Sequence, residues 1–296
     1  MHVWMVGVGT EGSAQRLRVG AELRRIRLVA GMSGEQAGRA LDWSQAKVSR
    51  METGRTAFTV RDVAGLLAVY GVADDVRAEL LAATAEDVGE GAWIVRAGGF
   101  PRRQGSMAAL ESVTRRIRQY QAMIVPGLLQ TREYAVAIAR AAGATDPERI
   151  ADARLERQRL LTAKKAPTYD VVIDGRAVFH RTSSPEVARD QVLHLISLAD
   201  QPGLSLHVIP VAAKQPVVSA VAFTMYDFRA KESPSVVWIE APTGDVYFSA
   251  PEDVARYDEL FSALLGVALG RSRSIEYLRT LAEDVERYAT EADRGR

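Results

Sequence analysis

Residues 44–51 form a run of side chains that could read the edges of nucleic-acid bases and hold a phosphate backbone. Gln45 and Arg50 suit adenine and guanine, respectively, because each can form two hydrogen bonds to one base in the major groove of DNA. Lys47 and Ser49 suit phosphate oxygens, which accept hydrogen bonds from such donors. This chemistry requires a scaffold that presents all four side chains on one exposed surface.

An amphipathic helix would provide that surface. Val48 and Met51, three residues apart, would face a protein core while the polar side chains face outward. Ser44 can cap the N-terminus of such a helix, and Ala46 could touch the methyl group of a thymine. The segment Gly54-Arg55-Thr56 follows the helix, where backbone amides and side chains can meet phosphates.

Apolar periodicity and capping residues predict four more helices, over residues 16–30, 33–41, 59–70 and 75–87. Ser33 with Gln36 has the spacing of a capping box, and the small residues Ala37 and Gly38 allow a close helix crossing. Asp42 can adopt the positive φ that a tight turn needs. We therefore expect an all-α, five-helix helix-turn-helix domain over 16–88. Its candidate DNA contacts are Ser33, Ser44, Gln45, Ala46, Lys47, Ser49, Arg50, Arg55 and Thr56.

The charge of the chain is distributed unevenly. The net charge is +1, but residues 14–62 hold ten basic and five acidic side chains, so this segment is +5 and the rest is −4. A basic segment on a mildly acidic body favours a nucleic-acid partner over an ordinary solvated surface. The chain has no cysteine, which excludes disulfides, thiolate metal sites and cysteine nucleophiles.

The second half has a different periodicity. Helices are expected over 107–123, 131–142, 147–165, 185–199, 251–269 and 273–289, and strands over 169–174, 204–209, 221–228 and 236–241, the last opening a hairpin that ends at Phe248. This predicts an α+β domain with a mixed or antiparallel sheet of about five strands. The resulting division of the chain is a flexible leader at 1–15, the helical domain at 16–88, a linker at 89–105, the α+β domain at 106–290 and a tail at 291–296.

The helical segment resembles the xenobiotic-response-element (XRE) type of helix-turn-helix, which is related to phage repressors. The residues that carry the resemblance are LRRIRLVAGMSGEQAGRALDWSQAKVSRMETGR. The resemblance implies an ion pair between Arg27 and Glu52 that ties the first helix to the third. It departs from the family at Gly34, where a glutamine that clamps a phosphate is usual.

The rest of the chain resembles a DUF5753-like domain that follows this helix-turn-helix in many actinobacterial regulators, WhiJ-like developmental regulators among them. The residues that carry this resemblance are QYQAMIVPGLLQTREYA, RLERQRLL and VVWIEAPTGDVYFSAPEDVARYDELFSALLGVAL. Together the two resemblances cover about residues 16–285. They imply a small protein partner, because some such regulators form antitoxin-like pairs with a neighbouring gene product.

Two places in the second domain are candidates for a partner or ligand contact. Gln130 and Thr131 precede a predicted helix, where they could either cap it or meet a partner. Trp238 and Tyr247 lie in the predicted hairpin, where aromatic residues are either cross-strand core pairs or a contact surface.

No arrangement of residues in the second domain points to catalysis. The histidines lack the spacing of metal ligands, and the serines lack the context of a nucleophile. We therefore expect no enzyme, no metal and no cofactor.

The leading hypothesis is a sequence-specific transcription regulator whose second domain senses a partner protein or ligand. The alternative is an antitoxin-like protein that neutralises a small partner and regulates its own operon. In either role we expect a cytoplasmic, nucleoid-associated homodimer on a palindromic operator of double-stranded DNA. The helices at 251–269 and 273–289 offer an apolar stripe for dimerisation, unless that stripe is core. No run of 18 apolar residues suggests a membrane span.

Overall fold

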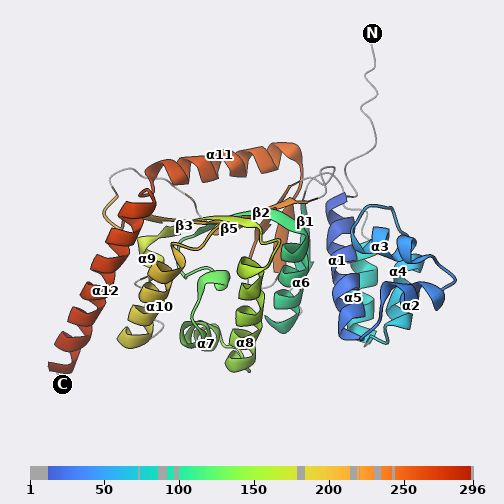
Figure 1. Cartoon of the computed structure of the whole chain (residues 1–296), viewed down its shortest axis with the longest axis horizontal. Helices are drawn as coiled ribbons and strands as arrows, with labels where there is room; N and C mark the ends of the chain where they lie inside the picture. The colour runs from blue at the N-terminus through green and yellow to red at the C-terminus, as the bar shows by residue number, and fades with distance from the viewer. Residues whose placement is uncertain are drawn as a thin grey trace, which may run out of the picture.

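The computed structural model describes residues 13–72, 74–85, 92–96, 100–178, 184–213, 219, 221–229, 235–241 and 244–294 of the 296-residue chain. A small all-helical domain and a larger α+β domain lie side by side (Figure 1). The fold class predicted from the sequence is therefore confirmed. Of the expected leader, residues 1–12 lie outside the described residues, and Ser13 already begins a helix.

The first domain consists of five helices: α1 (Ser13–Val29), α2 (Gly34–Arg39), α3 (Gln45–Glu52), α4 (Val60–Val69) and α5 (Asp74–Ala85). Local chemistry sets where three of them begin, because the side chains of Ser33, Ser44 and Thr59 accept hydrogen bonds from the first-turn amides of α2, α3 and α4. Apolar side chains from all five helices, Leu23 and Val48 among them, share one core.

The second domain is built on one seven-stranded sheet in the order β1-β7-β6-β5-β2-β3-β4. The strands are β1 (Ala92–Arg96), β2 (Thr114–Gln121), β3 (Thr168–Asp174), β4 (Leu204–Ile209), β5 (Phe223–Phe228), β6 (Val236–Ile239) and β7 (Gly244–Phe248). Strands β2, β3 and β4 are parallel, and all other pairs are antiparallel. The sheet is therefore mixed, which is one of the two predicted forms.

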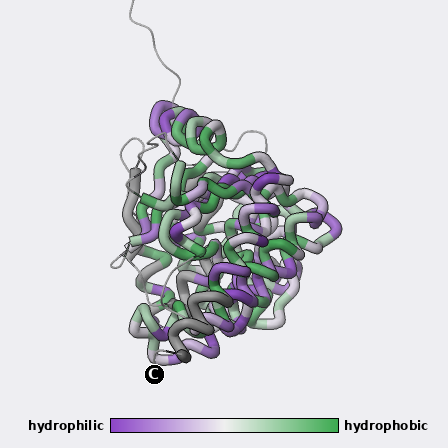
Figure 2. The backbone as a smooth tube through the Cα atoms, turned by 90° about the vertical axis from the view of Figure 1, so that its left-hand side faces the viewer, coloured by the Kyte–Doolittle hydropathy of each residue, from purple (hydrophilic) through white to green (hydrophobic). Residues whose placement is uncertain are grey.

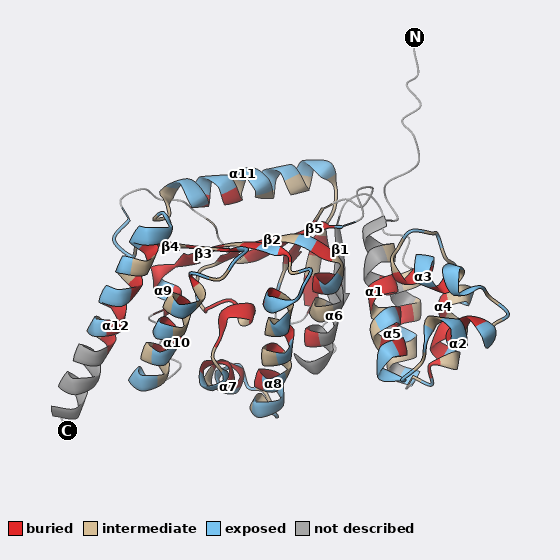
Figure 3. Ribbon diagram, viewed as in Figure 1, coloured by how far each residue is buried: buried red, intermediate tan, exposed pale blue. Residues whose placement is uncertain are grey.

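Helices cover both faces of the sheet unequally (Figure 1). One face carries α6 (Phe100–Val113), α7 (Arg132–Ala141), α8 (Pro147–Gln158), α10 (Pro185–Leu198) and α12 (Arg271–Arg294), with the short helices η1 (Gly127–Leu129), η2 (Arg159–Thr162) and α9 (Gly175–Val178). Among the described residues, α11 (Pro251–Val267) is the helix that covers the other face. Figure 3 shows buried residues along the sheet and on the helix sides that face it. The helices alternate hydrophilic and hydrophobic stretches, as amphipathic helices on a sheet do (Figure 2).

The apolar stripe of the last two helices is mostly core. Phe261 and Leu264 of α11 pack on one face of the sheet, and Leu278 and Leu281 of α12 belong to the core on the other face. Of the stripe offered for dimerisation, Leu265 remains exposed. Helix α12 continues to Arg294, so most of the tail expected at 291–296 is helical.

Three local predictions for the middle of the chain are wrong. The expected linker at 89–105 contains β1, and its last residues begin α6. The helix expected at 107–123 ends at Val113, and the chain then enters β2. The sheet has seven strands instead of about five. The cause is pairing between distant segments: β1 pairs with β7, and β2 lies between β3 and β5, which overrides the helix propensity of its arginines and glutamines.

The two domains meet through helices. Helix α1 packs against α6, and α6 in turn packs against α8 of the second domain. Figure 1 shows α1 and α6 side by side, with the rest of the first domain on the far side of α1. Helix α1 therefore contacts the second domain on one side and the core of the first domain on the other.

Candidate nucleic-acid interface

Helix α3 presents one polar, exposed face. Val48 and Met51 are fully buried in the core of the first domain. On the opposite side Gln45 and Arg50 are exposed, as are Ala46 and Ser49. The structure thus places four of the predicted contacts, Gln45, Ala46, Ser49 and Arg50, on one exposed surface of α3. The major groove can admit a single helix of this kind.

The approach of α2 to α3 depends on a glycine and a strained turn. A Cβ at Gly38 would lie 2.6 Å from the carbonyl oxygen of Trp43, so a larger residue there would push the two helices apart. Asp42, in the turn between them, has a φ of 55°, a region that Asp tolerates better than most residues. The turn and the crossing predicted from the sequence are both present.

Helix α1 holds the other side of α3. The Arg27 guanidinium forms two hydrogen bonds to the Glu52 carboxylate, Nε–Oε1 at 2.6 Å and Nη2–Oε2 at 2.8 Å. Both side chains are almost fully buried, and Tyr70 donates a third hydrogen bond to Glu52 at 3.4 Å. Burial and the Glu52 carboxylate raise the pKa of Tyr70, so its hydroxyl stays protonated and can donate. At Gly20 of α1, a Cβ would lie 2.3 Å from the Met51 carbonyl oxygen, so the helices touch closely here.

The remaining candidates flank α3. Ser33 caps α2 in a capping box, accepting from Gln36 N at 3.1 Å while its own amide donates to Gln36 Oε1 at 2.7 Å. Ser44 Oγ accepts from Lys47 N at 3.2 Å. Arg55 is exposed and Thr56 half-buried after α3. Both serine hydroxyls therefore accept hydrogen bonds from backbone amides of the protein. A DNA contact at Ser33 or Ser44 would have to share the hydroxyl with this cap or come from neighbouring residues.

Lys47 has partners that the sequence analysis missed. Its Nζ lies 3.0 Å from Asp62 Oδ1 and 3.6 Å from the centre of the Trp43 ring. Asp62 belongs to the Thr59–Asp62 capping box of α4. The spacing Thr-x-x-Asp was visible in the sequence, but the contact between α4 and α3 depends on the fold. Arg50, Arg55 and Arg61 are exposed, and within the described residues none of them forms an ion pair.

The candidate contacts of the second domain are mostly buried, which corrects the partner or ligand reading. Gln130 is 1% exposed; its Nε2 donates to Val125 O at 2.7 Å and its Oε1 accepts from Arg154 at 2.6 Å. Thr131 caps α7, accepting from Tyr134 N at 3.2 Å. Trp238 and Tyr247 face each other across β6 and β7 and are buried in the core. These four side chains stabilise the domain, and only Thr131 is partly exposed.

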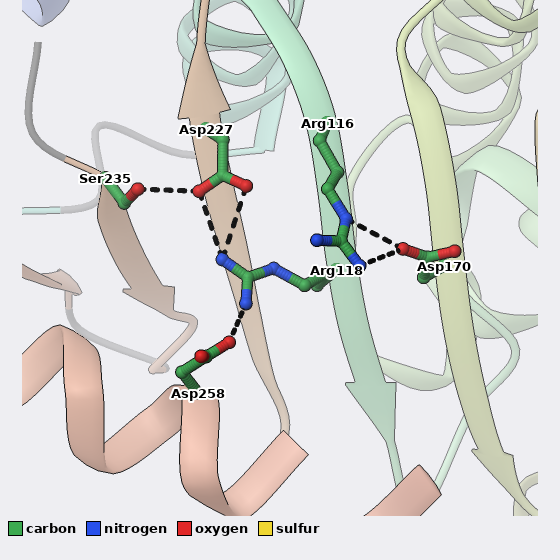
Figure 4. A network of polar contacts seen from close by, with 6 residues as sticks. All are labelled: Arg116, Arg118, Asp170, Asp227, Ser235 and Asp258. Carbon is green, nitrogen blue, oxygen red and sulfur yellow. Dashed lines mark hydrogen bonds and ion pairs between the residues drawn. The ribbon is translucent and has the colours of Figure 1, made fainter. Parts of the chain in front are cut away.

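A charge network centred on the buried pair Arg118–Asp227 connects α11 to the sheet (Figure 4). Arg118 of β2 donates to Asp227 of β5 at 3.0 Å and also contacts Asp258 of α11. Ser235 donates to Asp227 at 2.6 Å. Beside it, Arg116 donates to Asp170 of β3 at 2.7 Å. Every charge in this group has an opposite charge within reach, so the arrangement is that of a structural tie.

In the part of the chain that the structure describes, no group of three or more acidic or histidine side chains is arranged to hold a metal ion. None of the described helices combines the length and apolar character that crossing a membrane requires.

Comparison with known proteins identifies both domains. A family model described as "Helix-turn-helix domain" matches residues 18–80, and one described as "Domain of unknown function (DUF5753)" matches residues 104–280. No curated protein matches the chain. Among solved structures, one of the archaeal chromatin protein TrmBL2, described as showing a novel mode of DNA binding, is 13% identical with a TM-score of 0.33. The match covers 66% of this chain, which spans 61% of that one.

Proposed function

The chain belongs to the DUF5753 family, here with an N-terminal helix-turn-helix domain, and from this premise we propose that it is a sequence-specific DNA-binding transcription regulator. The observation that carries the proposal is the exposed polar face of α3, which is held from behind by a buried core and by the Arg27–Glu52 ion pair. A reader of the major groove needs such a face on a rigidly supported helix.

In this role α3 enters the major groove. Gln45 and Arg50 reach base edges, with preferences for adenine and guanine, and Ala46 meets a thymine methyl group. Ser49, Arg55 and Thr56 lie at the edge of the groove, where phosphates pass. The basic character of residues 14–62 supports attraction to DNA of any sequence, onto which the base contacts add specificity.

Replacing Arg50 by alanine tests the proposal. We expect Arg50→Ala to weaken binding to the cognate operator by about 1–3 kcal/mol and to relax the preference at one base position, because a bidentate contact to guanine is lost. The operator is first selected from random duplexes, and affinities are then measured by gel shift. Arg149→Ala, which removes an exposed arginine of α8 in the second domain, serves as control. Equal affinity of the Arg50 and Arg149 variants would contradict the assignment of α3 as the reading helix.

The second domain, in this proposal, is a sensor without enzymatic activity. The packing of α6 against α1 supports this role, because α1 carries Arg27 and so holds α3. A partner or ligand that shifts α6 could change the position of the reading helix. The alternative is an antitoxin-like role, in which the second domain neutralises a small partner protein. This role stays a prediction, because no contact among the described residues favours it over sensing.

We further expect two copies of the protein on each operator, at the nucleoid. One helix-turn-helix reads only a few base pairs, and pairs of modules on a palindrome provide the missing specificity. Sedimentation of the full-length protein should give a dimer near micromolar concentration, and two chains for each palindromic duplex. A monomer at tens of micromolar that also binds DNA one to one would rule this out. Because the apolar stripe of α11 and α12 is largely core, we do not assign the dimer surface to it.

A further inference from the structure

The ammonium group of Lys47 is held by contacts within the first domain. Its Nζ lies 3.0 Å from Asp62 Oδ1 at the start of α4 and 3.6 Å above the ring of Trp43, in the segment that leads into α3. The ammonium group thus bridges three parts of the domain. It is 38% exposed, whereas its partner Asp62 is 22% exposed, so the pair is partly shielded from water.

The carboxylate that holds Lys47 is itself fixed. Asp62 Oδ2 accepts from the amide of Thr59 at 2.9 Å and from its hydroxyl at 2.7 Å, and Thr59 Oγ1 accepts from Asp62 N at 3.1 Å. Burial opposes ionisation of Asp62, but the hydrogen bonds from Thr59 and Lys47 outweigh it and lower its pKa. Asp62 is therefore ionised at neutral pH, in a geometry set by the α4 cap.

The other cations near α3 are placed differently. Arg50 and Arg55 are exposed, and neither forms an ion pair within the described residues. They can move to a phosphate or a base without breaking an internal bond. To contact a phosphate, Lys47 would have to give up its contacts with the Asp62 carboxylate and the Trp43 ring. The free energy lost with these two contacts would offset much of the free energy gained from the phosphate.

We propose that Lys47 is a positioning residue that ties α3 to α4, and that Asp62, by neutralising its charge, limits the affinity of the protein for DNA of any sequence. The second half of this inference rests on the proposed DNA binding; the first half does not. Specificity is the difference between the affinity for the operator and the affinity for other DNA. Pairing one cation of the reading helix with a carboxylate lowers the sequence-independent affinity and so increases this difference.

The salt dependence of binding to a duplex without an operator tests the role of the charge. Each phosphate contact adds about 0.9 to the slope of log K against log salt concentration. Lys47→Met should leave the slope of the full-length protein unchanged. Asp62→Asn, which keeps an oxygen to cap α4, should free Lys47, steepen the slope by about 0.9 and raise the affinity several-fold.

Asp42→Asn is the matched control. It removes the same charge close to α3, Asn tolerates the positive φ of this turn, and Asp42 forms no ion pair within the described residues. Its slope should equal that of the wild type. A slope that flattens in Lys47→Met, or that changes equally in the Asp62 and Asp42 variants, would overturn the inference.

A thermal melt of the full-length protein without DNA tests the tie between helices independently. Lys47→Met and Asp62→Asn should each lower the melting temperature, and the double variant should lose less than the sum of the two losses, because both break one interaction. Additive losses would overturn the inference even if DNA binding is normal. If no variant and no wild-type protein binds DNA but the losses are coupled, the proposed function fails while the assignment of Lys47 as a positioning residue stands.

Discussion

Replacing Glu52 by alanine is expected to lower the free energy of unfolding of the first domain by about 3–5 kcal/mol, because it leaves the Arg27 guanidinium buried without an opposite charge. Arg27 loses both short hydrogen bonds to the carboxylate and, among the described residues, keeps its bond to Met32 O at 2.8 Å. Tyr70 loses its acceptor as well. Calorimetry of the full-length protein, with the helical domain followed as its own transition, measures the loss.

The matched control is Glu35→Ala. Glu35 also pairs with an arginine, Arg39, but on the surface of α2, where the side chains are 63% and 74% exposed. Such pairs contribute about 0–1 kcal/mol because water and salt screen them. Equal losses for Glu52→Ala and Glu35→Ala would mean that the Arg27–Glu52 pair is no more important than a surface pair. The support that we assign to α3 would then have to come from apolar packing alone.

Local sequence features of the helical domain predicted its structure well. The capping residues Ser33, Ser44 and Thr59 lie where the helices begin, since a cap depends only on residues within one turn. Asp42 takes the positive φ that the tight turn needs. The Arg27–Glu52 pair joins residues 25 positions apart in the chain. The spacing of these residues did not predict the pair, but the resemblance to a known family implied it.

The sheet could not be predicted as well, because its pairs join distant segments. Residues 92–96 become β1 only through pairing with β7, some 150 residues away in the chain. Residues 114–121 contain arginines and glutamines that favour a helix, but β3 and β5 on either side make them a central strand. No window of sequence around either segment contains the partner that decides its conformation.

Side-chain partners across the fold were the other limit. The local pattern showed that Gln130 and Thr131 precede a helix, and it left open whether a partner contacts them. Burial of Gln130 depends on Arg154 of α8, whose position only the tertiary structure gives. The same holds for Lys47, because Asp62 comes from another helix, 15 residues further along the chain.

A second large effect is expected in the α+β domain, where Arg157 of α8 pairs with Glu111 of α6. Arg157 Nε donates to Glu111 Oε2 at 3.0 Å, and its other nitrogens contact Glu111 Oε1 and Gln104. The two charged side chains are 5% and 3% exposed. Glu111→Ala should therefore cost about 3–5 kcal/mol of stability in this domain, since the guanidinium is left in a buried site without its carboxylate.

The double replacement of Arg157 by methionine and Glu111 by leucine separates charge from packing. It removes both charges and keeps apolar volume, so it should destabilise the domain less than Glu111→Ala alone. Glu156→Ala is the control, because Glu156 pairs with Arg159 on the surface at 2.8 Å with both side chains largely exposed and should change stability little. If the double variant is less stable than Glu111→Ala, apolar packing cannot replace the pair. The hydrogen-bond geometry of Arg157 and Glu111 is then what stabilises the domain. In that case α6, which also packs against α1, is held in place by these hydrogen bonds, and the same variant should weaken operator binding.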